Sequence, residues 1–294
     1  MKTSIIGAGQ MGNGIAQVFA AKGHQVTMID LNRKALDRGL ATISNSLDRL
    51  IKKERITTKE KENILANIRL ETSLEAGVRE AELVVEAATE NLDLKLKIFG
   101  QLDAAAPADC ILATNTSSIS ITQIAAATKR PHKVIGMHFM NPVPIMKLVE
   151  VIRGYATDEA TTETIMQLSK ELGKTPTEVN DYPGFVANRV LMPMINEAIT
   201  TLWEGVAGVE EIDTVMKLGM AHPMGPLQLA DFIGLDTCLA ILRVMQDGFG
   251  RAHYQPCPLL VNMVMAGKLG RKSGEGFYDY SGGGKELVVS GSFC

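Results

Sequence analysis

The glycine-rich turn near the start of the chain constrains its fold more than any other feature. The apolar run Ser4–Ile6 leads directly into Gly7-Ala8-Gly9-Gln10-Met11-Gly12, and a helical pattern follows from about Met11. In a strand–turn–helix unit the first glycine allows the bend, the second lets the backbone approach a pyrophosphate, and the third lets helix and strand pack closely. The free N–H groups at the helix start favour phosphate. The turn therefore predicts a dinucleotide site, although on its own it also fits a purely structural turn.

A carboxylate further along the chain indicates which dinucleotide binds. Asp30 directly follows the second predicted strand, Gln25–Ile29, at the position where a carboxylate hydrogen-bonds the adenosine ribose hydroxyls. A negative charge there repels a 2′-phosphate, so we expect NAD rather than NADP. Arg33 is near enough in sequence to weaken that preference.

Short apolar runs alternate with helical patterns in the first half of the chain. This alternation is typical of an α/β fold, a Rossmann-type doubly wound and mostly parallel sheet. The predicted strands are 3–6, 25–29, 83–85, 111–113, 134–137, 147–152 and 175–179. The predicted helices are 11–22, 33–51, 58–66, 92–105, 121–127 and 159–172. Residues 33–67 are too long and too charged for one crossover helix, so we expect a projecting helical hairpin there.

The alternation ends at Asp181-Tyr182-Pro183-Gly184, after which the pattern is only helical. We therefore expect a cofactor-binding domain over residues 1–182 and an all-helical domain over 183–294. The predicted helices of the second domain are 185–203, 209–218, 227–232, 235–247 and 258–266. Asp181 is a candidate cap at this boundary, and Pro193 is expected to kink the first helix. The tail 281–294, rich in glycine and serine, is expected to be peripheral.

Composition argues against several classes of partner. The 294 residues carry a net charge of −3 and are 46% hydrophobic, which is ordinary for a globular protein and does not suggest nucleic acid or a membrane surface as a partner. No apolar run reaches the roughly 20 residues of a membrane helix. The four cysteines form no C-x-x-C pair, and the five histidines lack metal-ligand spacing. We expect reduced thiols, no metal and a cytoplasmic location.

Polar residues follow several predicted strands at the edge where open α/β sheets bind ligands. One of them, His138, follows the strand 134–137. Hydride transfer to or from a nicotinamide needs a group that moves the hydroxyl proton, and imidazole, with an ordinary pKa of about 6.5, suits that task. His138 is the candidate for this role. The alternative is a packing residue at a strand end.

Three further polar residues are candidates to assist His138. Glu150 lies within the apolar run Leu148–Ile152, where an unpaired carboxylate is costly. It either points outward from an edge strand or holds the His138 ring and stabilises an imidazolium. Ser117 either caps a helix or donates a hydrogen bond to the reacting oxygen. Asn188, a poor helix former within a predicted helix, is a candidate to stabilise oxyanion charge.

Taken together, these residues resemble the L-3-hydroxyacyl-CoA dehydrogenase family, in particular its 3-hydroxybutyryl-CoA dehydrogenases. The resemblance runs from about Ser4 to Tyr280. It is carried by Val84-Val85-Glu86-Ala87, Glu90-Asn91, Asn115-Thr116-Ser117-Ser118, His138-Phe139, Asn141-Pro142-Val143-Pro144, Met146-Lys147-Leu148-Val149-Glu150, Pro183-Gly184-Phe185, Asn188-Arg189, Lys272 and Gly274-Glu275-Gly276-Phe277-Tyr278. The tail after Tyr280 matches no motif of the family.

The resemblance implies the reaction (S)-3-hydroxyacyl-CoA + NAD ⇌ 3-oxoacyl-CoA + NADH, with 3-hydroxybutyryl-CoA and acetoacetyl-CoA as the expected pair. It implies that His138 is the general base, Glu150 its partner, and that Ser117 and Asn188 contact the 3-oxygen. The implied cofactor contacts, besides the glycine turn and Asp30, are Glu90, Lys95, Asn115, Asn141 and Lys272. It also implies a helical domain that forms a homodimer or a higher homo-oligomer.

The acyl-CoA substrate is expected to meet a basic cluster at the tip of the projecting hairpin. Lys52 and Lys53, together with Arg55, are implied to contact the coenzyme A phosphates, although they also fit a solvated helix end. Two other functions stay open. One is a dehydrogenase of a free 3-hydroxy acid, which typically uses a catalytic lysine in the helical domain. The other is a non-enzymatic, crystallin-like NAD-binding protein.

Overall fold

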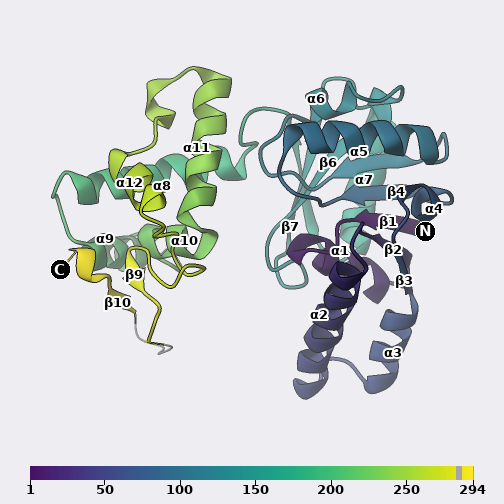
Figure 1. The fold of residues 1–294 in the computed structure, drawn as a ribbon, viewed down its shortest axis with the longest axis horizontal. Coiled ribbons are helices and arrows are strands. Elements are labelled where there is room, and N and C mark those ends of the chain that lie inside the picture. The colour runs from purple at the N-terminus through teal and green to yellow at the C-terminus, as the bar shows by residue number, and fades with distance from the viewer. Residues whose placement is uncertain (283–286, 294) are drawn as a thin grey trace. The chain divides into compact units, whose positions relative to one another are not determined.

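The computed structural model describes residues 1–282 and 287–293. The chain divides into two compact units, Met1–Tyr182 and Pro183–Cys294 (Figure 1). Each has its own buried core. The expected fold class, a Rossmann-type sheet domain followed by a helical domain, is confirmed. Within the described ranges, no helix is both long and apolar enough to cross a bilayer. Of the predicted tail, residues 283–286 lie outside the described residues, and so does Cys294, one of the four predicted thiols.

The first unit is built on one eight-stranded sheet in the order β3-β2-β1-β4-β5-β6-β7-β8. The strands are β1 Lys2–Ile6, β2 Gln25–Ile29, β3 Ile68–Glu71, β4 Leu83–Glu86, β5 Ile111–Thr114, β6 Val134–Phe139, β7 Leu148–Arg153 and β8 Thr175–Asn180. Neighbouring strands are parallel except β6 and β7, which pair antiparallel. Every residue of β4, β5 and β6 is buried, as expected for central strands covered on both faces.

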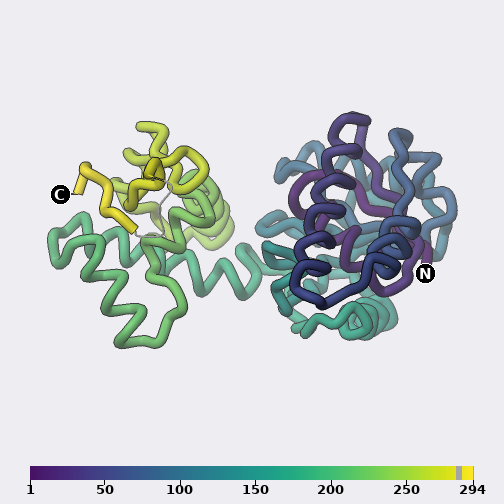
Figure 2. Tube along the Cα trace, turned by 90° about the horizontal axis from the view of Figure 1, so that it is seen from below, coloured from purple at the N-terminus to yellow at the C-terminus, as the bar shows by residue number. Residues whose placement is uncertain are grey.

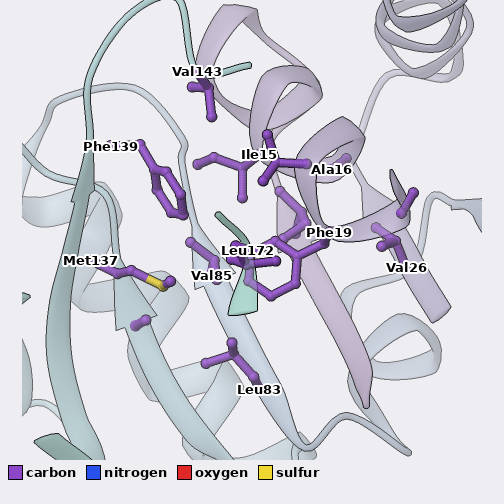
Figure 3. Close-up of a cluster of buried hydrophobic side chains, with 14 of the residues drawn as sticks. Ile15, Ala16, Phe19, Val26, Leu83, Val85, Met137, Phe139, Val143 and Leu172 are labelled. Atoms are coloured by element: carbon purple, nitrogen blue, oxygen red, sulfur yellow. The ribbon is translucent and has the colours of Figure 1, made fainter. Parts of the chain in front are cut away.

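Seven α-helices lie within the described residues of the first unit. They are α1 Gln10–Ala21, α2 Arg33–Lys52, α3 Thr58–Ala66, α4 Leu74–Val78, α5 Leu92–Ala105, α6 Ile121–Ala125 and α7 Glu159–Glu171, with the short 3-10 helix η1 Pro131–Lys133 before β6. Helices α2 and α3 form a hairpin that extends beyond the sheet (Figure 1), joined by an ion pair of 2.7 Å between Lys61 and Asp48. Helix α1 packs its apolar face, including Ile15 and Phe19, onto β1, β4 and β6 (Figure 3).

Strand β3 and helix α4 of the first unit were not predicted. Strand β3 is short, lies at the sheet edge and is only half-buried, so it lacks the apolar run that marks a central strand. The five-residue helix α4 follows it. The suggestion that Asp181 caps the boundary helix is wrong. Its Oδ2 accepts hydrogen bonds from Ser120 Oγ and Thr122 N, both at 2.7 Å, so it stabilises the start of α6 instead.

The second unit is mainly helical. Its elements are α8 Ala187–Trp203, α9 Val209–Thr214, the π-helix η2 Val215–Gly219, α10 Pro226–Ile233, α11 Leu235–Phe249, η3 Ala252–Tyr254, α12 Pro258–Met265, β9 Tyr278–Asp279, β10 Val288–Val289 and η4 Gly291–Phe293. Helix α8 continues as α-helix through Pro193. The predicted helix 209–218 changes to a π-helix after Thr214.

Two buried aspartates hold the helices of the second unit to its C-terminal segment. Asp213 accepts hydrogen bonds from Leu227 N at 2.8 Å and from the Tyr278 hydroxyl at 2.8 Å. Asp231 accepts from Phe277 N at 3.0 Å and Tyr278 N at 2.9 Å. Burial raises the pKa of Asp231 to about 6. The Gly276–Tyr278 stretch, one of the motifs of the resemblance, therefore lies against these carboxylates.

The described tail residues 287–293 lie mostly at the surface, as expected, but Ser290 among them is buried. Ser290 is fully buried, its N–H donates to Phe277 O at 3.0 Å, and its hydroxyl donates to Glu275 Oε1 at 2.6 Å. The rings of Phe293 and Phe277 lie 5.7 Å apart. The chain end thus packs beside the helices of its own unit (Figure 2), because β10 pairs with β9.

Candidate active site

A chain of three polar side chains lies at the carboxyl end of β5 and β6. His138 is the fifth residue of β6, and the antiparallel register sets it opposite Glu150 of β7. Its Nδ1 lies 2.8 Å from Glu150 Oε2, and its Nε2 lies 3.1 Å from Ser117 Oγ. His138 is 6% and Glu150 2% exposed. Glu150 therefore points at the histidine rather than outward.

The hydrogen-bonding capacities of Ser117, His138 and Glu150 determine which of them can take up a proton. An ionised carboxylate only accepts, so His138 Nδ1 carries the hydrogen in its bond to Glu150. In the neutral ring this leaves Nε2 as an acceptor on the side of Ser117. The arrangement fits a group that takes a proton at Nε2.

The serine is held in place by a glutamate on the neighbouring loop. Glu90 Oε1 accepts hydrogen bonds from Thr116 Oγ1 at 2.6 Å, from Ser117 N at 2.9 Å and from Ser118 N at 3.2 Å. Asn115 Oδ1 accepts from the backbone N–H of Phe139 at 2.9 Å. The ends of β5 and β6 are thereby tied together, which fixes the separation of serine and histidine.

A buried ion pair lies at the end of β4. Lys95 Nζ is 2.7 Å and 2.9 Å from the two carboxylate oxygens of Glu86, and these side chains are 1% and 0% exposed. Glu86 also accepts from Thr114 Oγ1 and Ala88 N, both at 2.7 Å. Glu90 Oε2 lies 3.5 Å from the same ammonium. Lys95, a predicted cofactor contact, thus belongs to the network that also holds Glu90.

The glycine turn has the geometry that its sequence predicts. Gly7 adopts a φ of 96°, and a Cβ there would lie 2.7 Å from Ala87 O. A Cβ on Gly12 would lie 1.8 Å from Gly7 O, whereas one on Gly9 would meet nothing within 4 Å. Gly9 is the N-cap of α1, and no side-chain hydrogen bond caps that end. The turn is therefore closed on its inner side and open above Gly9.

Two neighbours of the turn connect it to the rest of the site. Asp30 accepts hydrogen bonds from Ala8 N at 3.0 Å and Asn32 N at 3.1 Å, so the carboxylate lies beside the turn. Gln10 Nε2 donates to Asn141 Oδ1 at 3.1 Å. Asn141, which precedes a cis peptide bond to Pro142, links the start of α1 to the loop after His138.

Comparison with known proteins identifies the family. Residues 2–182 match the 3-hydroxyacyl-CoA dehydrogenase, NAD binding domain, and residues 184–280 match the 3-hydroxyacyl-CoA dehydrogenase, C-terminal domain. The chain belongs to the 3-hydroxyacyl-CoA dehydrogenase family. The resemblance inferred from the sequence motifs is confirmed, and so is NAD as the cofactor of the first domain.

Several known proteins are similar to this one over nearly the whole chain. A probable 3-hydroxybutyryl-CoA dehydrogenase of Bacillus subtilis is 56% identical over 276 residues, which is 94% of this chain and 96% of that protein. The structure of (S)-3-hydroxybutyryl-CoA dehydrogenase from Ralstonia eutropha superposes with a TM-score of 0.93 at 53% identity, covering 95% and 99% of the two chains. A diketoreductase of dicarbonyl compounds superposes with a TM-score of 0.82 at 31% identity, covering 95% and 99%.

The other residues singled out by the resemblance to this family lie elsewhere in the chain. Asn188 and Lys272 belong to the second unit. Asn188 is 8% exposed on α8, and Lys272 Nζ forms an ion pair of 2.5 Å with Asp236. Lys52 and Lys53 end α2 and are exposed at the tip of the hairpin, with Arg55 just beyond.

Sequence reasoning gave no role to two residues beside Lys95, namely Glu86, which it named only within a motif, and Thr114. Both are fully buried, and Thr114 Oγ1 donates to the same Glu86 carboxylate that pairs with the Lys95 ammonium. A charged residue that ends an otherwise apolar strand, as Glu86 does in Leu83–Glu86, is the signal that could have identified it. Its partner lies nine residues later on α5 and could not be named from spacing alone.

Proposed function

We propose that this chain interconverts (S)-3-hydroxybutyryl-CoA and acetoacetyl-CoA with NAD, and that His138 is the general acid and base. The hydrogen-bonded chain of Ser117, His138 and Glu150 carries the proposal. It lies at the sheet edge where open α/β folds bind their ligands. The short-chain substrate is supported by the similar proteins from Bacillus subtilis and Ralstonia eutropha, whose names specify 3-hydroxybutyryl-CoA.

The glycine turn fits the dinucleotide. The open space above Gly9 leaves room for a pyrophosphate to approach the backbone, and the uncapped N–H groups of α1 favour its negative charge. Asp30, beside the turn, would accept hydrogen bonds from the ribose hydroxyls. Bound here, NAD would supply the hydride acceptor for C3 of the substrate. Glu90, Lys95, Asn115 and Asn141 would surround the nicotinamide end, with Lys95 and Glu90 acting as one network.

The protein's own side chains move the proton of the 3-hydroxyl group. His138 Nε2 takes the proton of the 3-hydroxyl, and the Glu150 carboxylate stabilises the imidazolium that results. The Ser117 hydroxyl donates a hydrogen bond to the oxygen as its charge changes, with Asn188 of the second unit as a second donor. In the reverse direction His138 gives the proton back. Burial of His138 and Glu150 keeps water from competing for these bonds.

The coenzyme A moiety would meet the projecting hairpin. Lys52 and Lys53 are exposed at the C-terminal end of α2, and two ammonium groups so close in sequence attract a phosphate more strongly than either alone. Asp48 lies on the same helix but pairs with Lys61 at 2.7 Å. It therefore does not neutralise Lys52 and Lys53. Lys272, paired with Asp236, would approach the cofactor from the second unit.

We also propose that the chain forms a homodimer through the second unit. An apolar groove of about 440 Å³ lies between α8, α9 and η2 and is lined by residues that include Met194, Ala198, Val215 and Pro226. Two of the side chains that line it, Val206 and Val215, are 71% and 60% exposed. Exposed apolar surface beside an apolar groove is typical of a protein–protein contact site. Sedimentation velocity would measure the mass in solution.

The assay is NADH oxidation at 340 nm with acetoacetyl-CoA, compared with acetoacetate and with NADPH. We expect activity only with the thioester and NADH. His138→Gln should lower kcat on the order of 10²- to 10⁴-fold and leave the Kd for NADH near the wild-type value, while His132→Gln, an exposed histidine before β6, should change neither. Equal rates with acetoacetate would instead identify a dehydrogenase of free acids, and normal turnover by His138→Gln would exclude it as the acid and base.

A further inference from the structure

A buried lysine contacts the loop that joins the two strands of the proposed site. Lys174 lies between α7 and β8 and is 9% exposed. Its ammonium donates hydrogen bonds to two backbone carbonyls, Val143 O at 2.5 Å and Met146 O at 2.8 Å. Burial lowers the pKa of Lys174, and nearby Lys147 adds to that effect. Burial of a cation is costly without strong acceptors, so the two carbonyls account for its position.

The loop spans residues 140–147 and closes the β6–β7 hairpin. It contains a tight turn in which Ile145 N and Met146 N donate to Pro142 O at 3.0 Å and 2.9 Å. The strands on either side carry His138 and Glu150 at opposite register positions. A change in the loop would therefore change the relative position of these two residues directly.

A second contact fixes the other face of the same loop. Val143 is 2% exposed and packs in the core with Ile15 and Phe139 (Figure 3). A Cβ added to Gly14 of α1 would lie 2.9 Å from Val143 Cβ, which shows how closely helix and loop approach. Val143 thus packs its side chain against α1 and accepts a hydrogen bond from Lys174 with its carbonyl. Asn141, two residues earlier in the loop, contacts Gln10 of the same helix.

We propose that Lys174 is a positioning residue for hydride transfer. Its ammonium fixes the 140–147 loop, and the loop holds Asn141 and the His138–Glu150 hairpin in their working positions. Lys174 itself does not touch the reacting atoms. The inference rests on the proposed dehydrogenase function. Its magnitude follows from geometry, because displacement of a reacting group by about 1 Å costs on the order of 10²-fold in rate.

Single-turnover kinetics test this role. The rate constant for NADH oxidation with saturating acetoacetyl-CoA does not depend on how much of the protein is folded, so a loss of stability alone leaves it unchanged. We expect Lys174→Met to lower it on the order of 10- to 100-fold. Lys174→Arg, which keeps a charged donor, should recover part of the loss. Lys170→Met is the matched control, because Lys170 is an exposed lysine on α7, and it should retain the wild-type value.

Hydrogen exchange supplies a second readout. In Lys174→Met the amides of Ile145 and Met146 should exchange faster than in wild type, while those of α8 should not change. If Lys174→Met fails to fold, Val143→Ala loosens the other contact of the same loop and should lower the same rate constant. A wild-type rate constant in either variant would overturn the positioning role. If the wild-type protein does not oxidise NADH with acetoacetyl-CoA at all, the proposed function itself fails, and the inference fails with it.

Discussion

The buried pair of Glu86 and Lys95 gives the sharpest test of how this domain is stabilised. Both side chains are almost completely inaccessible, and their charged atoms are 2.7 Å and 2.9 Å apart. Glu86→Gln removes the negative charge and leaves the ammonium with Glu90 at 3.5 Å as its remaining carboxylate. Breaking a buried pair by removing one partner typically costs about 3–5 kcal/mol. Because Glu90 compensates in part, we expect a loss of about 3 kcal/mol in the free energy of unfolding.

An exposed ion pair with the same separation shows whether burial, rather than distance, determines the coupling energy. Lys2 and Glu80 lie at the same 2.7 Å, but their side chains are 51% and 74% exposed, so solvent screening should make their coupling much weaker than that of the buried pair. The Glu86–Lys95 cycle, with Glu86→Gln, Lys95→Met and the double variant, should show a coupling of about 2–3 kcal/mol. Removing both charges should therefore cost much less than the sum of the single losses.

Urea unfolding followed by far-UV circular dichroism measures these free energies. The single tryptophan of the chain, Trp203, lies on α8 of the second unit, so its fluorescence follows that unit separately and should show an unchanged transition. The reasoning is refuted if the buried and exposed pairs have equal coupling. It is also refuted if Glu86→Gln costs less than about 1 kcal/mol.

Two further predictions concern the glycine turn and the second unit. Gly9→Ala should keep the wild-type Tm, because its Cβ meets only open space in the protein. It should weaken NADH binding about tenfold or more, equivalent to about 1.4 kcal/mol. Gly12→Ala should lose stability as well, because its Cβ would lie 1.8 Å from Gly7 O. Equal Tm and Kd for both variants in thermal and fluorescence titrations would contradict this. Burial raises the pKa of Asp231 from 3.8 to about 6, so the folded state binds that proton more tightly. Its stabilising contribution is complete below pH 3.8 and is lost as the pH rises through 6, by about 3 kcal/mol. Because part of this contribution is already lost at pH 4, the stability difference between wild type and Asp231→Asn should shift by about 2 kcal/mol between pH 4 and 7, and a constant difference would refute the assignment.

The sequence by itself determined the features that depend on local chemistry. Gly7 to Gly12 follow a strand and begin a helix, and only glycine allows the φ of 96° at Gly7 and the close contact at Gly12. The alternation of apolar runs with helical periodicity predicted the sheet domain and the helical domain. Strands with weak patterns, such as β3 at the sheet edge, escaped prediction because a half-buried edge leaves little apolar signal.

Only the tertiary structure decided which polar groups meet. The sequence did not decide whether Glu150 faces outward or contacts a histidine. The antiparallel register of β6 and β7 makes it the partner of His138. Asp181 stabilises a helix about 60 residues earlier in the chain, and Lys174 binds carbonyls about 30 residues away. Periodicity in a sequence reports which side chains are buried. The partner of a buried charge is set by how strands and helices pack, and that depends on the whole chain.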